Sequence, residues 1–537
     1  MTRQSVLEWL DRPSRGVSAA LIFGGIASLL RGEDTNWDLR NYHFYNPWAW
    51  LNGRLDWDYA PAQIQSYHSP LLDLPFYALV RADVPAFAIT FLMGIPFGLA
   101  VYFFYRIARR AMHDMALEQE VATLCVIGLV ALTGAAGLSQ IGSTMNEWTT
   151  AALVLAALFV TVRAAQDADA PDAATSTLAG LLCGVAAGLK LPAAIYGVAI
   201  FVTFALSFRG RRGFARAMLL LGVALAAGFI AAYGYWGTVL WERFANPFFP
   251  YFNGVFHSEY WEPQSFFDTK FRPQTLARWL TLPFGLALRN RLASEADLRD
   301  PRLALLCVFA VLLIGSQIRR TRVTGRTLVA LLREDIPPSL RLVAVFAGTS
   351  YVAWLLAFTI YRYAIPLELT ASLLLVLAMR AALAQIPRRD ALIATAALLI
   401  VAVTVAPYWG RTRVHGGRYF DVTVPAIGAD SLVLMMTGEP FGYLVPFIES
   451  GARVIAPSSN FTQPAYDNRL QREMAALIAE QRGPIYAIRY LDRVDAGEEA
   501  TMAAYGLRRA DEGCRRIRSN LEGNRPLGLC PLFRAGA

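Results

Sequence analysis

Long apolar runs alternate with short polar segments along most of this chain. A helix that crosses a bilayer needs roughly 20 predominantly apolar residues. Runs of suitable length and composition lie at residues 14–31, 84–106, 120–138, 146–164, 174–190, 192–208, 214–240, 302–318, 341–359, 363–383 and 389–408. The pattern predicts an α-helical, polytopic membrane protein with about eleven membrane-spanning helices.

Three longer stretches break this pattern and are expected to lie outside the membrane. Residues 32–83 form a first loop, residues 241–300 a second large loop rich in aromatic side chains, and residues 409–537 a C-terminal tail. In the tail we expect strands and helices in alternation, with strands at Ser431–Thr437, Ala452–Ala456 and Pro484–Tyr490 and helices at Pro440–Ser450 and Asn468–Gln481. The predicted organisation is a membrane module over residues 1–408 and a small α/β domain over residues 409–537.

Composition and charge add an orientation to this picture. Hydrophobic residues make up 55% of the 537 positions, charged residues 17%, and the mean hydropathy is +0.37. The net charge of +9 does not indicate nucleic-acid binding, because the Arg residues cluster in alternate loops, as topology signals do. The clusters are Arg3, Arg12 and Arg15; Arg106, Arg109 and Arg110; Arg209, Arg211, Arg212 and Arg216; Arg319, Arg320, Arg322 and Arg326; and Arg380, Arg388 and Arg389. Because such residues stay in the cytoplasm, we expect a bacterial inner-membrane protein with a cytoplasmic N-terminus and a periplasmic C-terminal domain.

The five Cys residues divide into two groups. Cys125, Cys183 and Cys307 fall inside apolar runs and are expected to act as small packing residues. Cys514 and Cys530 fall in the C-terminal tail, which we place outside the cytoplasm. Disulfides form in that oxidising compartment, so these two Cys residues are predicted to pair.

The first loop carries the strongest candidate chemistry. Its acidic start, Gly32-Glu-Asp-Thr-Asn-Trp-Asp38, follows the first predicted span directly. Acidic residues at that depth are costly unless they are solvated, paired or used. Asp38 is followed by Tyr42, by an aromatic stretch that ends at Gly53, and by Tyr67-His-Ser-Pro-Leu71.

These motifs together resemble the C-type (GT-C) glycosyltransferases, especially the branch with protein O-mannosyltransferases and lipid A aminoarabinose transferases. That branch carries an acid after the first span, a Tyr four positions later and a Gly fifteen positions later, and Asp38, Tyr42 and Gly53 keep these offsets. His68-Ser-Pro-Leu71 is similar to a later basic-Pro-Pro-Leu motif, with Ser69 in place of a Pro. Leu39 stands where the branch often has Glu.

Three segments further along the chain extend the resemblance. Glu147, which ends Gly142-Ser-Thr-Met-Asn-Glu147, lies where the family places a second acid. Gly188-Leu-Lys-Leu-Pro192 is similar to a family segment with Gly and Lys at the outer end of a span, and Arg362-Tyr-Ala-Ile-Pro366 to an Arg-Tyr-x-x-Pro motif. The resemblance covers roughly the first 210 residues and the tenth predicted span.

The resemblance implies a glycosyltransferase that moves a sugar from a polyprenyl-phosphate donor to a glycan, lipid or protein acceptor of the cell envelope. Asp38 would be the general base, with inversion at the sugar carbon, and Asp34 and Glu147 the candidate second acids. The groups expected to bind the donor phosphate are Lys190, Arg362 and Arg40. The residues expected to bind substrate are Tyr42, His68, Asn246, Tyr251 and His257.

We expect no required cofactor. If a divalent cation such as Mg²⁺ or Mn²⁺ takes part, Asp34 and Asp38 would be its oxygen ligands. The sequence contains no Gly-rich phosphate loop, which argues against a nucleotide-sugar donor.

Each of these residues also has a purely structural interpretation. Asp38 could cap a helix or stay solvated, with Glu33 or Asp34 carrying the chemistry, and Lys190 could extend its ammonium to the interface. Arg362 could be a topology residue. The second loop, with Asn246-Pro-Phe-Phe-Pro-Tyr-Phe-Asn253, could be an interfacial aromatic belt instead of a platform over a sugar.

Two other functions compete with the transferase. An O-antigen ligase or polymerase also uses polyprenyl-linked donors, but usually relies on Arg and His in a large periplasmic loop. A lipid-linked sugar flippase is the non-enzyme alternative. Transporters tend to place polar groups at mid-membrane in repeated halves, whereas the charged residues here lie near predicted span ends and no repeat is visible.

Overall fold

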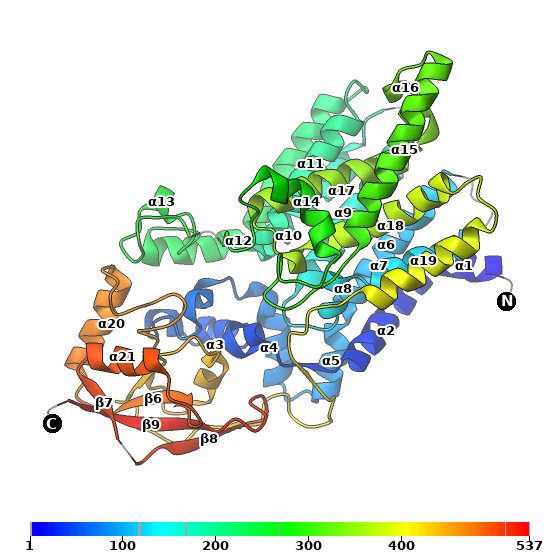
Figure 1. The fold of residues 1–537 in the computed structure, drawn as a ribbon. Helices are drawn as coiled ribbons and strands as arrows, with labels where there is room; N and C mark the ends of the chain where they lie inside the picture. Colours follow the sequence, from blue (N-terminus) through cyan, green and yellow to red (C-terminus); the bar gives the residue numbers. More distant parts are fainter. Residues whose placement is uncertain (1–2, 116–119, 167–168, 267, 511, 536–537) are drawn as a thin grey trace.

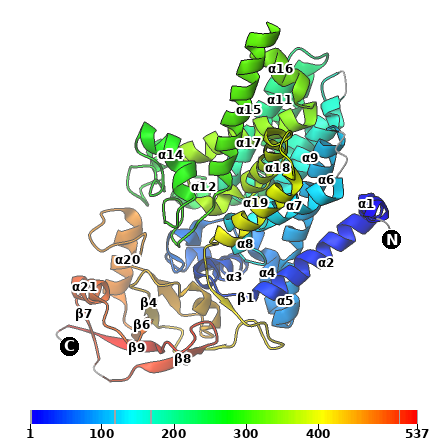
Figure 2. The same cartoon turned by 45° about the vertical axis from the view of Figure 1, so that its right-hand side comes forward.

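The computed structural model describes residues 3–115, 120–166, 169–266, 268–510 and 512–535. A bundle of long helices forms one part of the molecule and a β-sheet flanked by helices forms the other (Figure 1). The short helices α3 and α4 of the first loop, at Tyr45–Leu51 and Leu74–Arg81, lie between the two parts in both views (Figure 2). The first loop therefore occupies the junction between bundle and sheet.

Each predicted apolar run is occupied by helix. The helices are α2 (Pro13–Arg31), α5 (Ala86–Met93), α6 (Ile95–His113), α7 (Glu120–Leu132), α9 (Glu147–Arg163), α10 (Ala173–Leu189), α11 (Ala194–Ser207), α12 (Phe214–Phe244), α15 (Arg302–Thr324), α17 (Pro338–Ala357), α18 (Ile365–Ala382) and α19 (Arg389–Val403). The helical membrane-protein fold is thus confirmed.

The number of crossings is a separate question. Within the described residues, 6 helical segments are long and apolar enough to cross a membrane, and they are Pro13–Arg31, Ala86–His113, Phe214–Phe244, Arg302–Thr324, Pro338–Ala357 and Tyr361–Ala382. Shorter apolar helices cover Glu120–Leu132, Ala173–Leu189 and Leu191–Ser207. The count of about eleven stays a prediction.

Small residues let two of these helices approach closely. Gly180, Gly184 and Gly188 recur every fourth position along α10 and face backbone atoms of α12. A Cβ at Gly184 would overlap the carbonyl oxygen of Leu225. Apolar side chains gain little by leaving lipid, so this small-residue packing is what holds membrane helices together.

The C-terminal part forms a mixed sheet with strand order β3-β8-β9-β6-β4-β5, and β7 pairs with β9. Its strands are β3 (Val422–Thr423), β4 (Leu432–Leu434), β5 (Arg453–Ile455), β6 (Ile485–Tyr490), β7 (Leu507–Arg509), β8 (Arg515–Ser519) and β9 (Leu527–Arg534). Strands β5, β4 and β6 are parallel, and β9 runs antiparallel to β6. The expected α/β class is confirmed.

Two layers cover this sheet. Helices α20 (Arg469–Glu480) and α21 (Ala496–Ala504) pack on the face that carries Leu432 and Leu434. Val433, on the opposite face, packs with buried side chains of the first loop. The first loop thus serves as the second layer of the C-terminal sheet.

Two smaller features complete the tail. The helix predicted over Pro440–Ser450 is wrong, because this segment forms only a short 3₁₀ helix, η8, at Gly442–Phe447 that includes Pro446. Cys514 and Cys530 are joined by a disulfide that ties the start of β8 to β9.

A two-residue ladder links the start of the first loop to the start of the tail. Strand β1 (Glu33–Asp34) pairs antiparallel with β2 (Arg411–Thr412). The Arg411 guanidinium donates hydrogen bonds to the carbonyls of Gly32 at 3.3 Å and Ile141 at 2.8 Å. These bonds fix the segment that leads into Asp38.

Candidate active site

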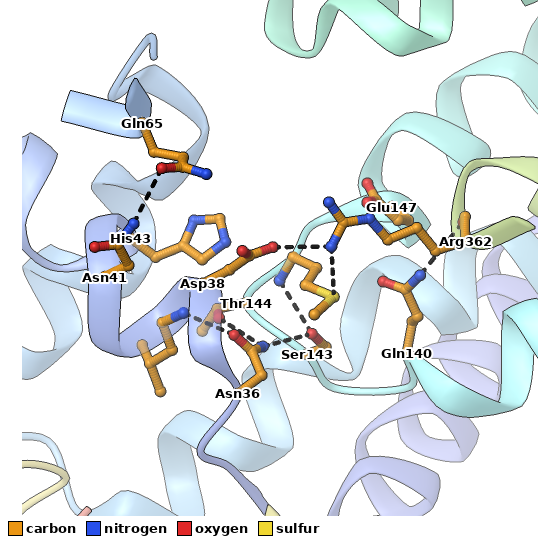
Figure 3. A network of polar contacts seen from close by, with 12 residues as sticks. Asn36, Asp38, Asn41, His43, Gln65, Gln140, Ser143, Thr144, Glu147 and Arg362 are labelled. Carbon is orange, nitrogen blue, oxygen red and sulfur yellow. Dashed lines mark hydrogen bonds and ion pairs between the residues drawn. The ribbon is translucent and has the colours of Figure 1, made fainter. Parts of the chain in front are cut away.

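Asp38 lies in the first turn of a helix that starts just beyond β1. Asn36 accepts a hydrogen bond from the backbone N–H of Leu39 at 2.7 Å, which caps this turn. The helix continues as the π-helix η1 over Leu39–His43. This geometry directs the Asp38 carboxylate toward Arg362 (Figure 3), whose Nη1 donates to Oδ2 at 3.1 Å.

A second ion pair lies beside the first. Lys190, between α10 and α11, places Nζ 2.5 Å from Glu147 Oε2 and donates to the carbonyl of Met145 at 2.5 Å. Glu147 is 3% exposed, whereas Lys190 keeps 17% and Arg362 19% of its side chain exposed. The two cations therefore remain reachable, while the Glu147 carboxylate is buried beneath one of them.

Tyr363 joins the two pairs. The Lys190 Nζ atom lies 5.6 Å and the Arg362 Cζ atom 5.1 Å from the centroid of its ring. The Tyr363 hydroxyl accepts a hydrogen bond from Arg362 Nη2 at 3.1 Å. Two cations close to one aromatic ring can together bind an anion with several oxygens.

The loop between α8 (Ala135–Ser139) and α9 positions several of these groups. Gln140 donates to the carbonyl of Arg362 at 3.3 Å, and Met145 supplies the carbonyl that Lys190 contacts. Thr144 binds Asp34 Oδ2 through its backbone N–H at 2.7 Å and its hydroxyl at 2.8 Å. This single loop thus contacts Lys190, Arg362 and Asp34 at the start of the first loop.

Asp34 and Glu33 have structural partners. Asp34 accepts a hydrogen bond from Asn36 Nδ2 at 2.6 Å, in addition to the two from Thr144. Its side chain is buried. Glu33 accepts from the backbone N–H of His415 at 2.8 Å. The pKa of Glu33 is raised by burial, against the lowering effect of His415. Of the candidate acids, Glu147 is the one that pairs with Lys190, and its role as a second acid stays a prediction.

An aromatic group borders Asp38 on the side of the second loop. His68 Nε2 pairs with the Tyr251 hydroxyl at 2.9 Å, and the Tyr42 ring lies edge-on to His68 with centroids 5.4 Å apart. Burial lowers the pKa of His68 to about 4. His68 is therefore a neutral hydrogen-bonding group at physiological pH.

The charge on Asp38 is set by two opposing effects. Burial raises its pKa, but the neighbouring positive charges, that of Arg362 first and that of Lys190 with it, lower the pKa by more. The net pKa lies below the ordinary value, so the carboxylate is ionised at neutral pH and available to accept a proton.

Other predicted residues lie elsewhere. Arg40 does not join the two cations, because its Nη1 lies 3.2 Å from Glu522 of the C-terminal sheet domain. His257 is exposed on the second loop. Asn246 is buried and accepts from the backbone N–H of Phe248 at 2.9 Å, so it shapes its own loop.

The site includes residues that the sequence motifs did not single out. His43 and Asp73 form a buried pair with 2.7 Å between Nδ1 and Oδ1, and Asn146 Nδ2 donates to the same oxygen at 3.0 Å. Both residues lie close to the motifs in the sequence, because His43 is five positions after Asp38 and Asp73 is five positions after His68. The pairing itself depends on how the loop folds back.

A metal ion was a conditional expectation. Across the described ranges, no group of three or more His, Cys, Asp or Glu side chains is arranged to hold one. The Asp34 carboxylate is bound by Thr144 and Asn36, and Asp38 faces Arg362. Asp34 and Asp38 therefore have separate partners in this structure, and a divalent cation bound by the two stays a prediction.

Comparison with known proteins gives a fold-level likeness. No protein-family model and no curated protein matches this chain. Two crystal structures of ArnT from Cupriavidus metallidurans are similar to it over 96% of its length, each at 12% identity. The apo structure has a TM-score of 0.46 and covers 96% of that chain, and the structure bound to undecaprenyl phosphate has 0.48 and covers 97%. Likeness of this degree says nothing about chemistry, which has to come from the site's own residues.

Proposed function

We propose that this protein is an integral-membrane glycosyltransferase that moves a sugar from a polyprenyl-phosphate donor to a cell-envelope glycan, lipid or protein acceptor. The observation that carries the proposal is the Asp38 carboxylate held 3.1 Å from Arg362, beside the Lys190–Glu147 pair. One group can accept a proton and the neighbouring groups can bind a phosphate.

The chemistry follows from these positions. The acceptor hydroxyl attacks the anomeric carbon and gives its proton to Asp38, while the bond to the donor phosphate breaks and the phosphate leaves with the electron pair. Attack opposite the leaving group inverts the sugar carbon. Arg362 and Lys190 stabilise the negative charge that develops on the phosphate.

The location of the site supports this donor. Arg362 lies at the start of the apolar segment Tyr361–Ala382, and Lys190 lies between two apolar helices. Cations at this level meet a phosphate whose polyprenyl chain stays in the bilayer. We place this face in the periplasm, with the N-terminus in the cytoplasm, on the distribution of Arg residues.

A radiolabelled polyprenyl-phosphate sugar pool tests the proposal. Membranes with the wild-type protein should consume the donor, and the Asp38→Asn variant should lose about 10²–10⁴-fold in turnover while it still binds the lipid. Asp56→Asn is the matched control, because the Asp56 side chain is 87% exposed and pairs with Arg243 of α12, not with Arg362 or Lys190.

The outcomes separate the candidate functions. Donor consumption that is unaffected by Asp38→Asn would move the base to another acid, with Glu147 next. A wild-type protein that never consumes a lipid-linked donor would refute the transferase and favour transport.

A further inference from the structure

His43 is a buried titratable group that the chemistry above does not use. It ends the π-helix η1, one turn beyond Asp38, and its side chain is 3% exposed. Its ring lies 4.0 Å, centroid to centroid, from that of Tyr42. Figure 3 shows the His43 ring beside the Asp38 side chain.

One nitrogen of this ring is held by a carboxylate. The Nδ1 atom lies 2.7 Å from Asp73 Oδ1, and an ionised carboxylate can only accept, so the contact requires a proton on Nδ1. Asp73 ends the 3₁₀ helix η4 (Leu71–Asp73), and its Oδ1 also accepts from Asn146 Nδ2 at 3.0 Å. A carboxylate that accepts from Nδ1–H fixes both the orientation and the tautomer of an imidazole. Nε2 is then left with a free lone pair.

The second ring nitrogen is unoccupied. The Nε2 atom of His43 is buried and has no hydrogen-bond partner among the described residues, as is also true of Glu147 Oε1 and Arg362 Nε. What distinguishes Nε2 is its place on a ring that lies beside the Asp38 carboxylate (Figure 3). An imidazole oriented by a carboxylate, with its second nitrogen free, is the arrangement of a general base.

The surroundings of Asp38 favour transfer of its captured proton to a neighbouring acceptor. Because its carboxylate faces Arg362 and Lys190, its pKa is low despite burial, and it holds a captured proton weakly. The titratable and charged groups around Asp38 and the His43 ring include Asp73, His68, Tyr42, Lys190, Arg362, Glu147 and Tyr363. Among these, Lys190 and Arg362 are cations committed to the phosphate, and His68 pairs with Tyr251.

We infer that His43 is the proton-relay residue of this site: it accepts on Nε2 the proton that Asp38 takes from the acceptor hydroxyl, with Asp73 stabilising the imidazolium. The inference rests on the proposed transfer reaction. The proton passes from the acceptor oxygen to Asp38 and then to His43, while the sugar–phosphate electron pair leaves with the phosphate. The Asp38 carboxylate is regenerated within the same turnover.

Two variants test the roles of the two His43 ring nitrogens separately. His43→Asn retains an amide N–H near the Nδ1 position, which can still meet Asp73, but removes Nε2. His43→Gln places an amide near Nε2 and gives up the contact with Asp73. We expect His43→Asn to lower kcat by about 10²-fold or more with the donor KM changed less than threefold. His113→Asn, at the exposed end of α6, is the control.

The pH profile and the solvent isotope effect exclude a merely structural role. With the relay removed, kcat of His43→Asn should rise with hydroxide concentration where the wild type is flat, and the solvent deuterium isotope effect should increase. A His43→Asn variant with the wild-type kcat, profile and isotope effect would overturn the inference. Should His43→Asn fail to fold, the near-isosteric Asp73→Asn replaces it, and unchanged kinetics there would overturn the inference equally.

A spectroscopic measurement is independent of turnover. The chain has 5 His residues, so ¹⁵N-His labelling gives a small set of ring signals. The signal that disappears in His43→Asn should show Nδ1 protonated and Nε2 bare at neutral pH. A ring protonated on Nε2 would refute the relay, whereas absence of donor consumption by the wild-type protein would refute the proposed function instead.

Discussion

Arg362 Nη1 and Asp38 Oδ2 lie 3.1 Å apart, although 324 positions separate the two residues in the sequence. The pair joins the start of the first loop to the start of a late apolar helix. In the absence of donor, each side chain neutralises the other. When a phosphate binds, the guanidinium has to serve both anions, and its several N–H groups permit this.

Replacement of Arg362 by Lys tests this double role. The charge remains, but a single ammonium cannot contact Asp38, Tyr363 and a phosphate with fixed geometry. We expect the donor KM to rise about tenfold, equivalent to about 1.4 kcal/mol, with a smaller loss in kcat. The measurement is steady-state transfer with donor varied. Arg418→Lys, at a side chain 74% exposed, should change neither value.

We expect the Lys190–Glu147 ion pair to contribute to the thermal stability of the protein. Removal of one member of a buried ion pair leaves an uncompensated charge and typically costs about 3–5 kcal/mol. Lys190→Met and Glu147→Gln should each lower the midpoint of thermal unfolding, and the double variant should recover part of the loss. Purely additive losses in the double variant would contradict a coupled pair.

The lowered pKa of His68 should make the free energy of unfolding depend on pH. Its pKa in the folded protein is about 4, against an ordinary value of 6.5, so unfolding takes up a proton between these values. The associated stability is present above pH 6.5 and is lost as the pH falls toward 4, by at most about 3 kcal/mol. Thermal unfolding at pH 7.5 and pH 5 should show a smaller acid loss for His68→Gln than for wild type. Equal losses in both proteins would assign the effect to other groups.

Gly142 is predicted to be essential for the loop that holds the cations. Its φ is +67°, which side chains disfavour, and a Cβ there would overlap Ser28 Oγ. Gly142→Ala should displace the segment that carries Met145 and Glu147 and reduce transfer at least tenfold. Gly128→Ala in α7 is the control, because a Cβ there has no atom within 4 Å. Full activity of Gly142→Ala would show that the loop tolerates the shift.

Much of the fold could be predicted, because hydrophobic runs directly report which segments prefer lipid. The helices match the eleven or so predicted runs closely. Strands β7 and β8 were missed because Arg-rich stretches such as Arg515–Ser519 do not show a clear apolar alternation, and β9 because its apolar run contains Gly528 and Pro531, which argue against a strand interior. Their pairing depends on long-range contacts and on the Cys514–Cys530 link.

The site was only partly predictable for a related reason. Sequence motifs identified Asp38, Lys190, Glu147 and Arg362, which the structure brings together. The same reasoning placed Arg40 with them, although nothing local reveals that Glu522 competes for its guanidinium. A motif indicates which residues carry chemistry, whereas the choice of ion-pair partner is decided by tertiary packing.

The ladder between β1 and β2 has a consequence for how the protein matures. The first loop is synthesised early, but Arg362, Arg411 and Glu522, which bind it, emerge from the ribosome much later. Until then Asp38 lacks Arg362, and Arg40 lacks Glu522. The contacts around the first loop are therefore complete only after the last strands of the C-terminal sheet have been synthesised.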